Sequence, residues 1–369
     1  MTRLLFLVNS LPAAGGAEQF VLNHARRADR GRYDVRVAQM GGSETLRGAF
    51  EAIGVPVVNL GERRRPDPRA LVRLYAYLRR ERIDVVQAHV AFSVLCARVV
   101  GRLARVPAIV ATEQAMVGQY PRATQRALEA TARLANACVF ISRASFRSWQ
   151  KVLPSVEPLI IPNGIDARAV AARAAAGRDA VRAELGLAPD DIAFANVARL
   201  HPDKGQATLL AAFARAALPR ARLFIAGVGP LAAELRAQAA GLGVGERVRF
   251  LGERTDVPRL LGGFDAYVHP SRAEALGVSV LEAMSAALPT IGAAVDALPE
   301  YIADGATGWL FPPDDAAALA ERLRAVAADL AGARAVGRAG QARMFRDYDI
   351  GASVAAYEAL YERLLARVS

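Results

Sequence analysis

Residues 269–284 read HPSRAEALGVSVLEAM, and the spacing of two glutamates in this stretch governs the interpretation of the chain. Glu274 and Glu282 follow a short apolar run. The pattern predicts a strand, a loop that holds Glu274, and a helix that begins near Leu276 and holds Glu282. A helix N-terminus has free N–H groups that bind anions, and Gly277 lets an anion approach the backbone closely. The stretch therefore predicts a site for a phosphate-bearing ligand, but two solvated glutamates beside a helix start fit the same pattern.

The rest of the chain alternates short apolar runs with helical patterns, which predicts parallel sheets joined by right-handed crossovers. A chain of 369 residues has the length of two domains. The predicted fold class is α/β, with two Rossmann-like, doubly wound parallel-sheet domains that face a central cleft. Strands are expected at 3–9, 33–39, 55–60, 85–88, 108–112, 137–141, 192–198, 222–226, 248–251, 266–269, 290–292 and 309–311. Helices of the second half are expected at 206–217, 230–240, 257–261, 276–287 and 316–328.

The domain junction is expected at residues 161–166, which read IPNGID. Pro, Asn and Gly together continue neither a helix nor a central strand. The domains are therefore predicted at 1–165 and 166–348, followed by a C-terminal helix within 349–369. Ligands of such sheets bind beyond the carboxyl ends of the strands, so the cleft between the domains is the expected active site.

The net charge of +11 raises the question of an anionic partner. The basic residues are spread along the chain without interleaved aromatic residues or zinc-ligand spacing, which argues against nucleic acid. An anionic phospholipid surface is the better candidate, because Arg63-Arg64-Arg65 and the basic amphipathic segment up to Arg82 resemble an interfacial helix. An ordinary solvated helix is the alternative.

The cysteines and the lengths of the apolar runs indicate the cellular compartment. Cys96 and Cys138 lie in apolar contexts and are expected to be buried and reduced. The apolar run at Leu4–Val8 is too short for a signal peptide, and no run approaches the roughly 18 apolar residues of a membrane span. We therefore expect a cytoplasmic protein that is held, if at all, peripherally at the inner membrane face.

The opening stretch resembles the retaining glycosyltransferases of family 4, also called glycosyl transferases group 1. Their signature is a Pro-Ser-x-x-Glu loop followed by a helix with Glu-Ala-Met, and here residues 270–274 read PSRAE and residues 282–284 read EAM. The resemblance covers nearly the whole chain. It implies a GT-B fold and transfer of a sugar from a nucleotide diphosphate donor with retention of configuration. It also implies that 1–165 binds the acceptor, that 166–348 binds the nucleotide sugar, and that the last helix returns to the first domain.

A departing diphosphate needs either a metal ion or fixed cations. The sole Asp-x-Asp, at 347–349, lies away from every predicted strand end, so it is interpreted as a turn or a helix start. Arg199 and Lys204 follow the first strand of the second domain, and the resemblance assigns this pair to the diphosphate. A surface Asp-Lys-Gly turn is the alternative. We therefore predict no metal and no cofactor, with the nucleotide sugar as co-substrate.

Two glycine-rich loops add to the predicted donor site. Gly15 and Gly16 lie between the first strand and the first helix, where backbone N–H groups can approach a phosphate or a sugar. Gly227 follows another strand and is expected to line the donor pocket. The catalytic residues are expected to be Glu274, Lys204 and Arg199. The predicted donor-binding residues are Gly15, Gly16, Arg199, Lys204, Gly227, Glu274, Leu276, Gly277, Val278 and Glu282.

The predicted contacts to the acceptor or the sugar are His89, Glu113 and Gln114. His89 ends a strand, and a structural histidine is the alternative. Gln114 stands where many family members have a histidine, and it cannot act as a base near neutral pH. The chain also departs from the family at Ala275 and Asp296, where glycines are usual, and we expect these changes to narrow the donor loop and to alter the preferred sugar.

The favoured function is a retaining glycosyltransferase that uses a UDP- or GDP-sugar and a glycan or lipid-linked acceptor in polysaccharide or glycolipid biosynthesis. A nucleotide-sugar epimerase of the same fold needs paired acid–base groups, and the single histidine assigned to the cleft argues against it. A phosphorylase would carry a cofactor lysine or a much longer chain. A non-catalytic binder would be marked by loss of Lys204 or Glu274, and both are present.

Metal independence follows as a testable expectation. Sugar transfer should persist in excess EDTA, because fixed cations rather than a carboxylate-bound metal ion are predicted to stabilise the leaving diphosphate. Initial rates measured with and without EDTA check this. Loss of activity with EDTA and its recovery with magnesium or manganese would contradict the assignment.

Overall fold

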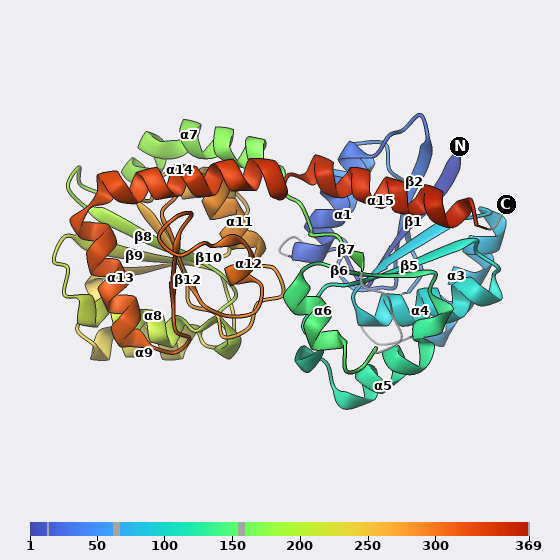
Figure 1. Cartoon of the computed structure of the whole chain (residues 1–369), viewed down its shortest axis with the longest axis horizontal. Coiled ribbons are helices and arrows are strands. Elements are labelled where there is room, and N and C mark those ends of the chain that lie inside the picture. The colour runs from blue at the N-terminus through green and yellow to red at the C-terminus, as the bar shows by residue number, and fades with distance from the viewer. Residues whose placement is uncertain (13–14, 62–66, 154–158, 368–369) are drawn as a thin grey trace. The chain divides into compact units, whose positions relative to one another are not determined.

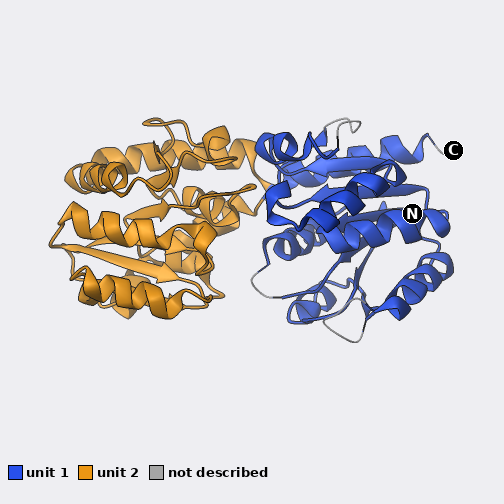
Figure 2. Ribbon diagram, turned by 90° about the horizontal axis from the view of Figure 1, so that it is seen from below, with its two compact units in different colours: residues 1–164, 350–369 blue, residues 165–349 orange. Residues whose placement is uncertain are grey.

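The computed structural model describes residues 1–12, 15–61, 67–153 and 159–367. The chain divides into two compact units, drawn in two colours in Figure 2. Unit 1 comprises Met1–Gly164 and Ile350–Ser369, and unit 2 comprises Ile165–Asp349, each within one residue of the predicted limits. Each unit is a parallel sheet with helices on both faces (Figure 1), which confirms the predicted α/β class with two doubly wound domains. Arg63-Arg64-Arg65 lies outside the described residues.

The sheet of unit 1 has the strand order β3-β2-β1-β4-β5-β6-β7, and each described pair of neighbours runs parallel. Its strands are β1 (Thr2–Val8), β2 (Tyr33–Gln39), β3 (Val57–Asn59), β4 (Val85–His89), β5 (Ala108–Glu113), β6 (Ala137–Phe140) and β7 (Leu159–Ile160). All were predicted except β7, which is too short to leave an apolar run in the sequence.

Strand β1 shows why this sheet is covered on both faces. Leu4, Phe6 and Val8 belong to one apolar core, and Leu5 and Leu7 belong to the other. Successive side chains of a strand point to opposite faces, so an unbroken apolar run is buried on both sides. The covering helices are α1 (Gly16–Arg27), α2 (Arg47–Glu51), α3 (Pro68–Arg80), α4 (Ala91–Leu103), α5 (Arg122–Thr131), α6 (Arg143–Trp149) and α15 (Ile350–Leu365), with 3-10 turns at Val117–Gln119 and Ala132–Leu134.

Helix α15 is the last element of the chain, and it packs on unit 1. Tyr357 and Tyr361 lie fully buried in the same core as Phe6 and Phe20. The Tyr361 hydroxyl also donates a hydrogen bond to Gln87 of β4. The C-terminal segment therefore supplies part of the core of the first domain, in the place that the family resemblance implies.

The sheet of unit 2 has the order β10-β9-β8-β11-β12-β13, again with parallel described neighbours. The strands are β8 (Ile192–Val197), β9 (Ala221–Ala226), β10 (Val248–Gly252), β11 (Ala266–His269), β12 (Thr290–Ala293) and β13 (Trp309–Phe311). The helices are α7 (Ala167–Glu184), α8 (Gln206–Ala216), α9 (Ala232–Gly241), α10 (Val257–Leu261), α11 (Val278–Ser285), α12 (Leu298–Tyr301), α13 (Ala316–Ala328) and α14 (Leu330–Asp347), with 3-10 turns at Pro202–Lys204 and Gly245–Arg247.

Helices α7 and α14 were not predicted, because their buried positions repeat every three or four residues but are filled mostly by Ala and Gly, which give a weak apolar signal. Asp265, buried at the start of β11, links them to the sheet. It accepts hydrogen bonds from Arg178 and Arg182 of α7 and from Arg334 of α14, at 3.1, 3.1 and 3.2 Å. None of the helices in the described ranges has both the length and the apolar character that crossing a bilayer requires.

Tyr361→Ala should lower the free energy of unfolding of unit 1 by about 3–5 kcal/mol, because it opens a cavity in a full core. Urea denaturation followed through Trp149, in a Trp309→Phe background, isolates this unit. Ala356→Ser on the exposed face of α15 is the control and should change little. Equal stability of the two variants would show that α15 is not part of the core.

Candidate functional site

Two loops of unit 2 meet at the carboxyl ends of β8 and β11, which are neighbours in the sheet. Loops that follow neighbouring parallel strands leave from the same edge, where such sheets bind their ligands. Lys204 ends the 3-10 turn after β8, and its Nζ lies 2.8 Å from Oε2 of Glu274 in the loop after β11. The two side chains are 12% and 14% exposed, so this is a mostly buried ion pair.

Gly205 permits the close approach of these loops. Its φ of 65° lies in the left-handed region, and a Cβ there would be 2.0 Å from the carbonyl oxygen of Pro270. The backbones also bond directly, since the Arg272 N–H donates to the Asp203 carbonyl at 2.8 Å. A side chain at 205 would therefore separate Lys204 from Glu274.

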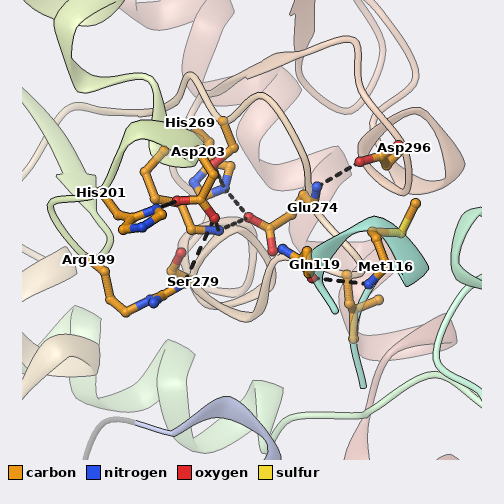
Figure 3. Close-up of polar contacts among 12 residues, drawn as sticks. Met116, Gln119, Arg199, His201, Asp203, His269, Glu274, Ser279 and Asp296 are labelled. Carbon is orange, nitrogen blue, oxygen red and sulfur yellow. Dashed lines mark hydrogen bonds and ion pairs between the residues drawn. The ribbon is translucent and has the colours of Figure 1, made fainter. Parts of the chain in front are cut away.

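His269 is a third member of the cluster, and the sequence interpretation missed it. It is buried, and its Nε2 lies 2.9 Å from both Glu274 Oε2 and the Ser271 hydroxyl, while its Nδ1 lies 3.3 Å from the Tyr267 hydroxyl. Figure 3 shows His269 and Asp296 on opposite sides of Glu274. The argument that this chain has a single histidine near its active site, namely His89, is therefore wrong. The signal was present, because His269 is a polar residue that ends a buried strand.

Glu274 is held as a carboxylate. Burial alone would raise its pKa, but the hydrogen bond with His269 and the charge of Lys204 outweigh burial and lower the pKa to about 2. Both interactions use Oε2. No described residue bonds to Oε1, so that oxygen keeps its capacity to accept a hydrogen bond.

Asp296 supports the same loop. Its Oδ2 accepts a hydrogen bond from the Glu274 N–H at 2.8 Å, and its φ is 43°. Aspartate adopts the left-handed region more readily than most residues, so it can replace glycine at this position. The side chain that replaces the usual glycine thus holds the loop that carries Glu274; its effect on the preferred sugar stays a prediction.

Helix α11 begins at Val278, two residues later than predicted, and Gly277 precedes it with φ 83°. Gly277 provides no side-chain cap, but its carbonyl accepts hydrogen bonds from the Val280 and Leu281 N–H groups at 2.9 and 3.1 Å, so this residue leaves the Val278 and Ser279 N–H groups uncapped. The Leu276 carbonyl accepts from the Tyr301 hydroxyl at 2.6 Å. Glu282 is partly buried in the second turn; burial raises its pKa to about 7, and its carboxylate has no described hydrogen-bond or ion-pair partner.

Arg199 and Gly227 lie beside this cluster. The Arg199 side chain is 68% exposed and its Nη2 is 3.8 Å from Asp203, so it is only weakly held. A Cβ at Gly227 would lie 2.0 Å from the Ala198 carbonyl oxygen. Gly227 therefore packs directly against the backbone of the loop that carries Arg199, and any larger residue at this position would clash with that backbone.

The residues predicted in unit 1 occupy different surroundings. Gly15 precedes helix α1 and Gly16 begins it, whereas residues 13 and 14 lie outside the described ranges. A Cβ at Gly15 would lie 1.9 Å from Oε2 of Glu18, so the glycine makes room for that carboxylate. Burial raises the pKa of Glu18.

His89 and Asn163, which are buried, are linked by the partly buried Gln114. Gln114 Nε2 lies 2.8 Å from His89 Nδ1, and Asn163 Nδ2 donates to Gln114 Oε1 at 2.6 Å. Burial lowers the pKa of His89 to about 3, so the ring is neutral. His89 has no exposed surface, which fits the structural alternative better than contact with a sugar or an acceptor.

Glu113 requires a correction. It is fully buried and lies 3.3 Å from Arg98, which is also fully buried. Burial raises the pKa of Glu113. The predicted contact with an acceptor is wrong for this structure, because the Glu113 side chain has no exposed surface and is paired with a buried arginine.

Both halves of the chain match models of glycosyltransferase domains. Residues 14–169 match Glycosyltransferase Family 4, and residues 177–343 match Glycosyl transferases group 1. The chain belongs to these glycosyltransferases. This confirms the family that the Pro-Ser-x-x-Glu and Glu-Ala-Met motifs predict.

Relatives and solved structures place this glycosyltransferase among diverse enzymes. It is 33% identical over 238 residues to alpha-maltose-1-phosphate synthase of Mycobacterium tuberculosis, covering 60% of this chain and 62% of that protein. It is 26% identical over 309 residues, 77% of each chain, to the UDP-Gal:alpha-D-GlcNAc-diphosphoundecaprenol alpha-1,3-galactosyltransferase of Escherichia coli. Anabaena HepE in complex with UDP-glucose superimposes with a TM-score of 0.86 at 22% identity, over 98% of this chain and 100% of that chain. The last likeness shows the fold, which is the predicted GT-B fold.

The Asp-x-Asp of this glycosyltransferase lies where α14 ends. Asp347 pairs with Arg346 at 2.7 Å, and Asp349 forms a backbone bridge with Ile165. Within the described ranges, no three His, Cys, Asp or Glu side chains gather in a way that could hold a metal ion.

Lys204→Met should destabilise unit 2 by about 3 kcal/mol near neutral pH, because it leaves Glu274 buried without its cation. The folded-state pKa of Glu274 lies below its ordinary value of 4.5, so this contribution is complete above about pH 5 and is lost as the pH falls toward 2. Urea denaturation from pH 7 to pH 3.5 should show the difference between wild type and variant shrinking below pH 4.5. Lys151→Met, at the other lysine of the chain, is the control. A difference that does not change with pH would contradict the ion pair.

Proposed function

We propose that the chain is a retaining, metal-independent glycosyltransferase that transfers a sugar from a UDP-sugar to a lipid-linked or glycan acceptor. The observation that carries the proposal is the contact of Lys204 with Glu274, braced by His269, at the carboxyl ends of β8 and β11. A fixed cation and a fixed carboxylate at the ligand-binding edge of a parallel sheet suit the diphosphate and the sugar of one donor.

The diphosphate has three sources of positive potential. Lys204 is a compact charge that its partners hold in place, and Arg199 is an exposed cation that can move toward a bound anion. The N-terminus of α11 adds the N–H groups of Val278 and Ser279, which the side-chain-free Gly277 does not cap. Because cationic groups stabilise the negative charge that develops on the leaving group, this arrangement supports a mechanism without a metal ion.

The low pKa of Glu274 argues against its use as the base of an inverting reaction, and the proposal of retention rests on the family resemblance. A carboxyl group with a pKa of about 2 is a poor base near neutral pH, so it is not suited to take the proton of the acceptor. In the proposed step, the acceptor oxygen bonds to the anomeric carbon on the face from which the bond to the phosphate oxygen breaks. The departing phosphate takes the acceptor's proton, and the nucleoside diphosphate leaves. Glu274 would instead accept a hydrogen bond from the transferred sugar through Oε1. The same weak basicity argues against an epimerase, even though His269 supplies the second group that this alternative requires.

The donor and acceptor classes follow from relatives. The name of the Escherichia coli relative specifies UDP-galactose and a sugar linked to diphosphoundecaprenol, and HepE holds UDP-glucose. We therefore place UDP before GDP, and a lipid-linked acceptor of polysaccharide or glycolipid biosynthesis before a free sugar. The chain spans 62% of the length of the maltose-1-phosphate synthase, so that enzyme's activity is not carried over.

Glu282 is proposed to accept hydrogen bonds from the ribose, and its ionisation makes this testable. At pH 8, Glu282→Gln should weaken UDP binding roughly 10- to 100-fold, the value of one hydrogen bond to a charged group. With a pKa of about 7 in the free protein, Glu282 is mostly protonated at pH 6. The ratio of the variant Kd to the wild-type Kd should therefore be largest at pH 8 and fall toward pH 6. Protonation of the UDP phosphate changes both dissociation constants alike, so it does not affect this ratio. Isothermal titration gives both constants.

Glu274→Gln is the matched variant in the same experiment. It should leave the Kd for UDP nearly unchanged and lower the turnover number about 100-fold or more, because its contact is with the transferred sugar. Turnover is measured by mass spectrometry of a diphosphoundecaprenol-linked sugar with UDP- and GDP-sugars. Equal weakening of UDP binding by both variants would refute the division of roles. Tight binding of UDP without transfer from any donor would favour a non-catalytic binder.

A further inference from the structure

The net positive charge of this protein comes from one of its two units. Unit 1 contains 26 Lys and Arg against 14 Asp and Glu, and unit 2 contains 21 against 22. Unit 1 therefore carries a net charge of +12 and unit 2 carries −1. A charge needed only for solubility has no reason to be divided in this way, so the division indicates an anionic partner of unit 1.

The exposed apolar side chains gather in the same unit. Of the nine large hydrophobic residues that are exposed in the described chain, five lie on helices α3 and α4. Val72 is 69% exposed and Leu103 is 68% exposed, the two highest values apart from Met1. The five residues are Leu71, Val72, Tyr75, Val99 and Leu103.

Helix α3 is apolar on two sides. Its inner stripe, which includes Leu74 and Leu78, is buried against the sheet, as in any helix of this fold. Leu71, Val72 and Tyr75 lie outside that stripe, where a solvated helix is normally polar. The core of unit 1 therefore does not explain these three side chains.

Helices α3 and α4 form one surface. They pack against each other, and Arg79 Nη1 of α3 donates to the Ala104 carbonyl at the end of α4. Arg69 and Arg102 lie on the same two helices. Within the described residues, no carboxylate pairs with the side chains of Arg69, Arg79 or Arg102, so their charges are not neutralised. The α3–α4 surface thus comprises Leu71, Val72, Tyr75, Val99 and Leu103 with Arg69, Arg79 and Arg102.

We propose that the α3–α4 surface docks unit 1 onto an anionic phospholipid bilayer. Exposed aliphatic side chains beside an exposed tyrosine and unpaired arginines are the composition of an interfacial helix, in which the apolar residues enter the headgroup region and the cations meet lipid phosphates. A folded acidic partner would satisfy the charge but would need a complementary apolar face. Nucleic acid would leave Val72 and Leu103 without a role. The inference is independent of the proposed function, because docking requires neither donor nor acceptor.

Vesicle sedimentation of the full chain tests the charge. Vesicles of phosphatidylcholine with phosphatidylglycerol should bind the protein, and pure phosphatidylcholine should bind it far more weakly. Raising the salt concentration should weaken binding, because it screens exposed charges. Arg69→Gln/Arg79→Gln should weaken binding to the anionic vesicles about 10-fold or more. Arg173→Gln/Arg215→Gln removes the same charge from exposed positions of unit 2 and should change binding little. Equal loss in both variants would overturn the proposed surface.

A fluorescent label tests the apolar contact directly. Cys96 and Cys138 are buried, so Val72→Cys supplies an accessible thiol for an environment-sensitive dye, and Leu242→Cys in unit 2 is the control. The dye at position 72 should shift to the blue with anionic vesicles, and the dye at 242 should not. No shift at 72, an equal shift at both positions, or the same shift at 72 with heparin as with vesicles would each overturn bilayer docking. Transfer to a short-chain, water-soluble acceptor analogue measures the enzymatic function separately from this surface.

Discussion

The ion pair between Lys204 and Glu274 is the interaction on which the site of unit 2 depends. It joins loops that are 70 residues apart in sequence and that meet because β8 and β11 are parallel neighbours. Each residue would be costly to bury alone, so the pair specifies how the two loops sit against each other. Gly205 makes the approach sterically possible, and His269 and Asp296 hold Glu274 from two further directions.

The same pair explains how one carboxylate can serve a reaction without acting as its base. In the unliganded chain, Lys204 satisfies Glu274 and keeps it ionised. A diphosphate bound beside Lys204 would compete for that cation, which links occupation of the phosphate site to the electrostatics of the sugar site. Glu282 differs sharply, because burial without a cation raises its pKa to about 7. Two glutamates eight positions apart thus acquire different properties from their surroundings alone.

The arginines of the two units serve different ends. In unit 2 many arginines form ion pairs with carboxylates that hold the fold together. Asp265 alone pairs with three of them and so links α7 and α14 to the sheet. In unit 1, Arg98 pairs with Glu113 inside the core, whereas Arg69 and Arg79 of α3 and Arg102 of α4 have no carboxylate partner among the residues that the structure describes. The composition of the whole chain does not reveal this division, since both units are rich in arginine.

The sequence by itself determined the parts that depend on local pattern. Alternation of apolar runs and helical repeats located the strands of both sheets except β7, and the motif at 270–284 located the site loop and the family. Tertiary structure decided which polar residues meet. His269 became part of the site because it ends a strand beside Lys204, whereas Glu113, equally at a strand end, turned inward to Arg98. The sequence of a strand shows that successive side chains point to opposite faces of the sheet. The charged groups and backbone that pack against a given side chain come from distant segments, and those contacts set its exposure and its pKa.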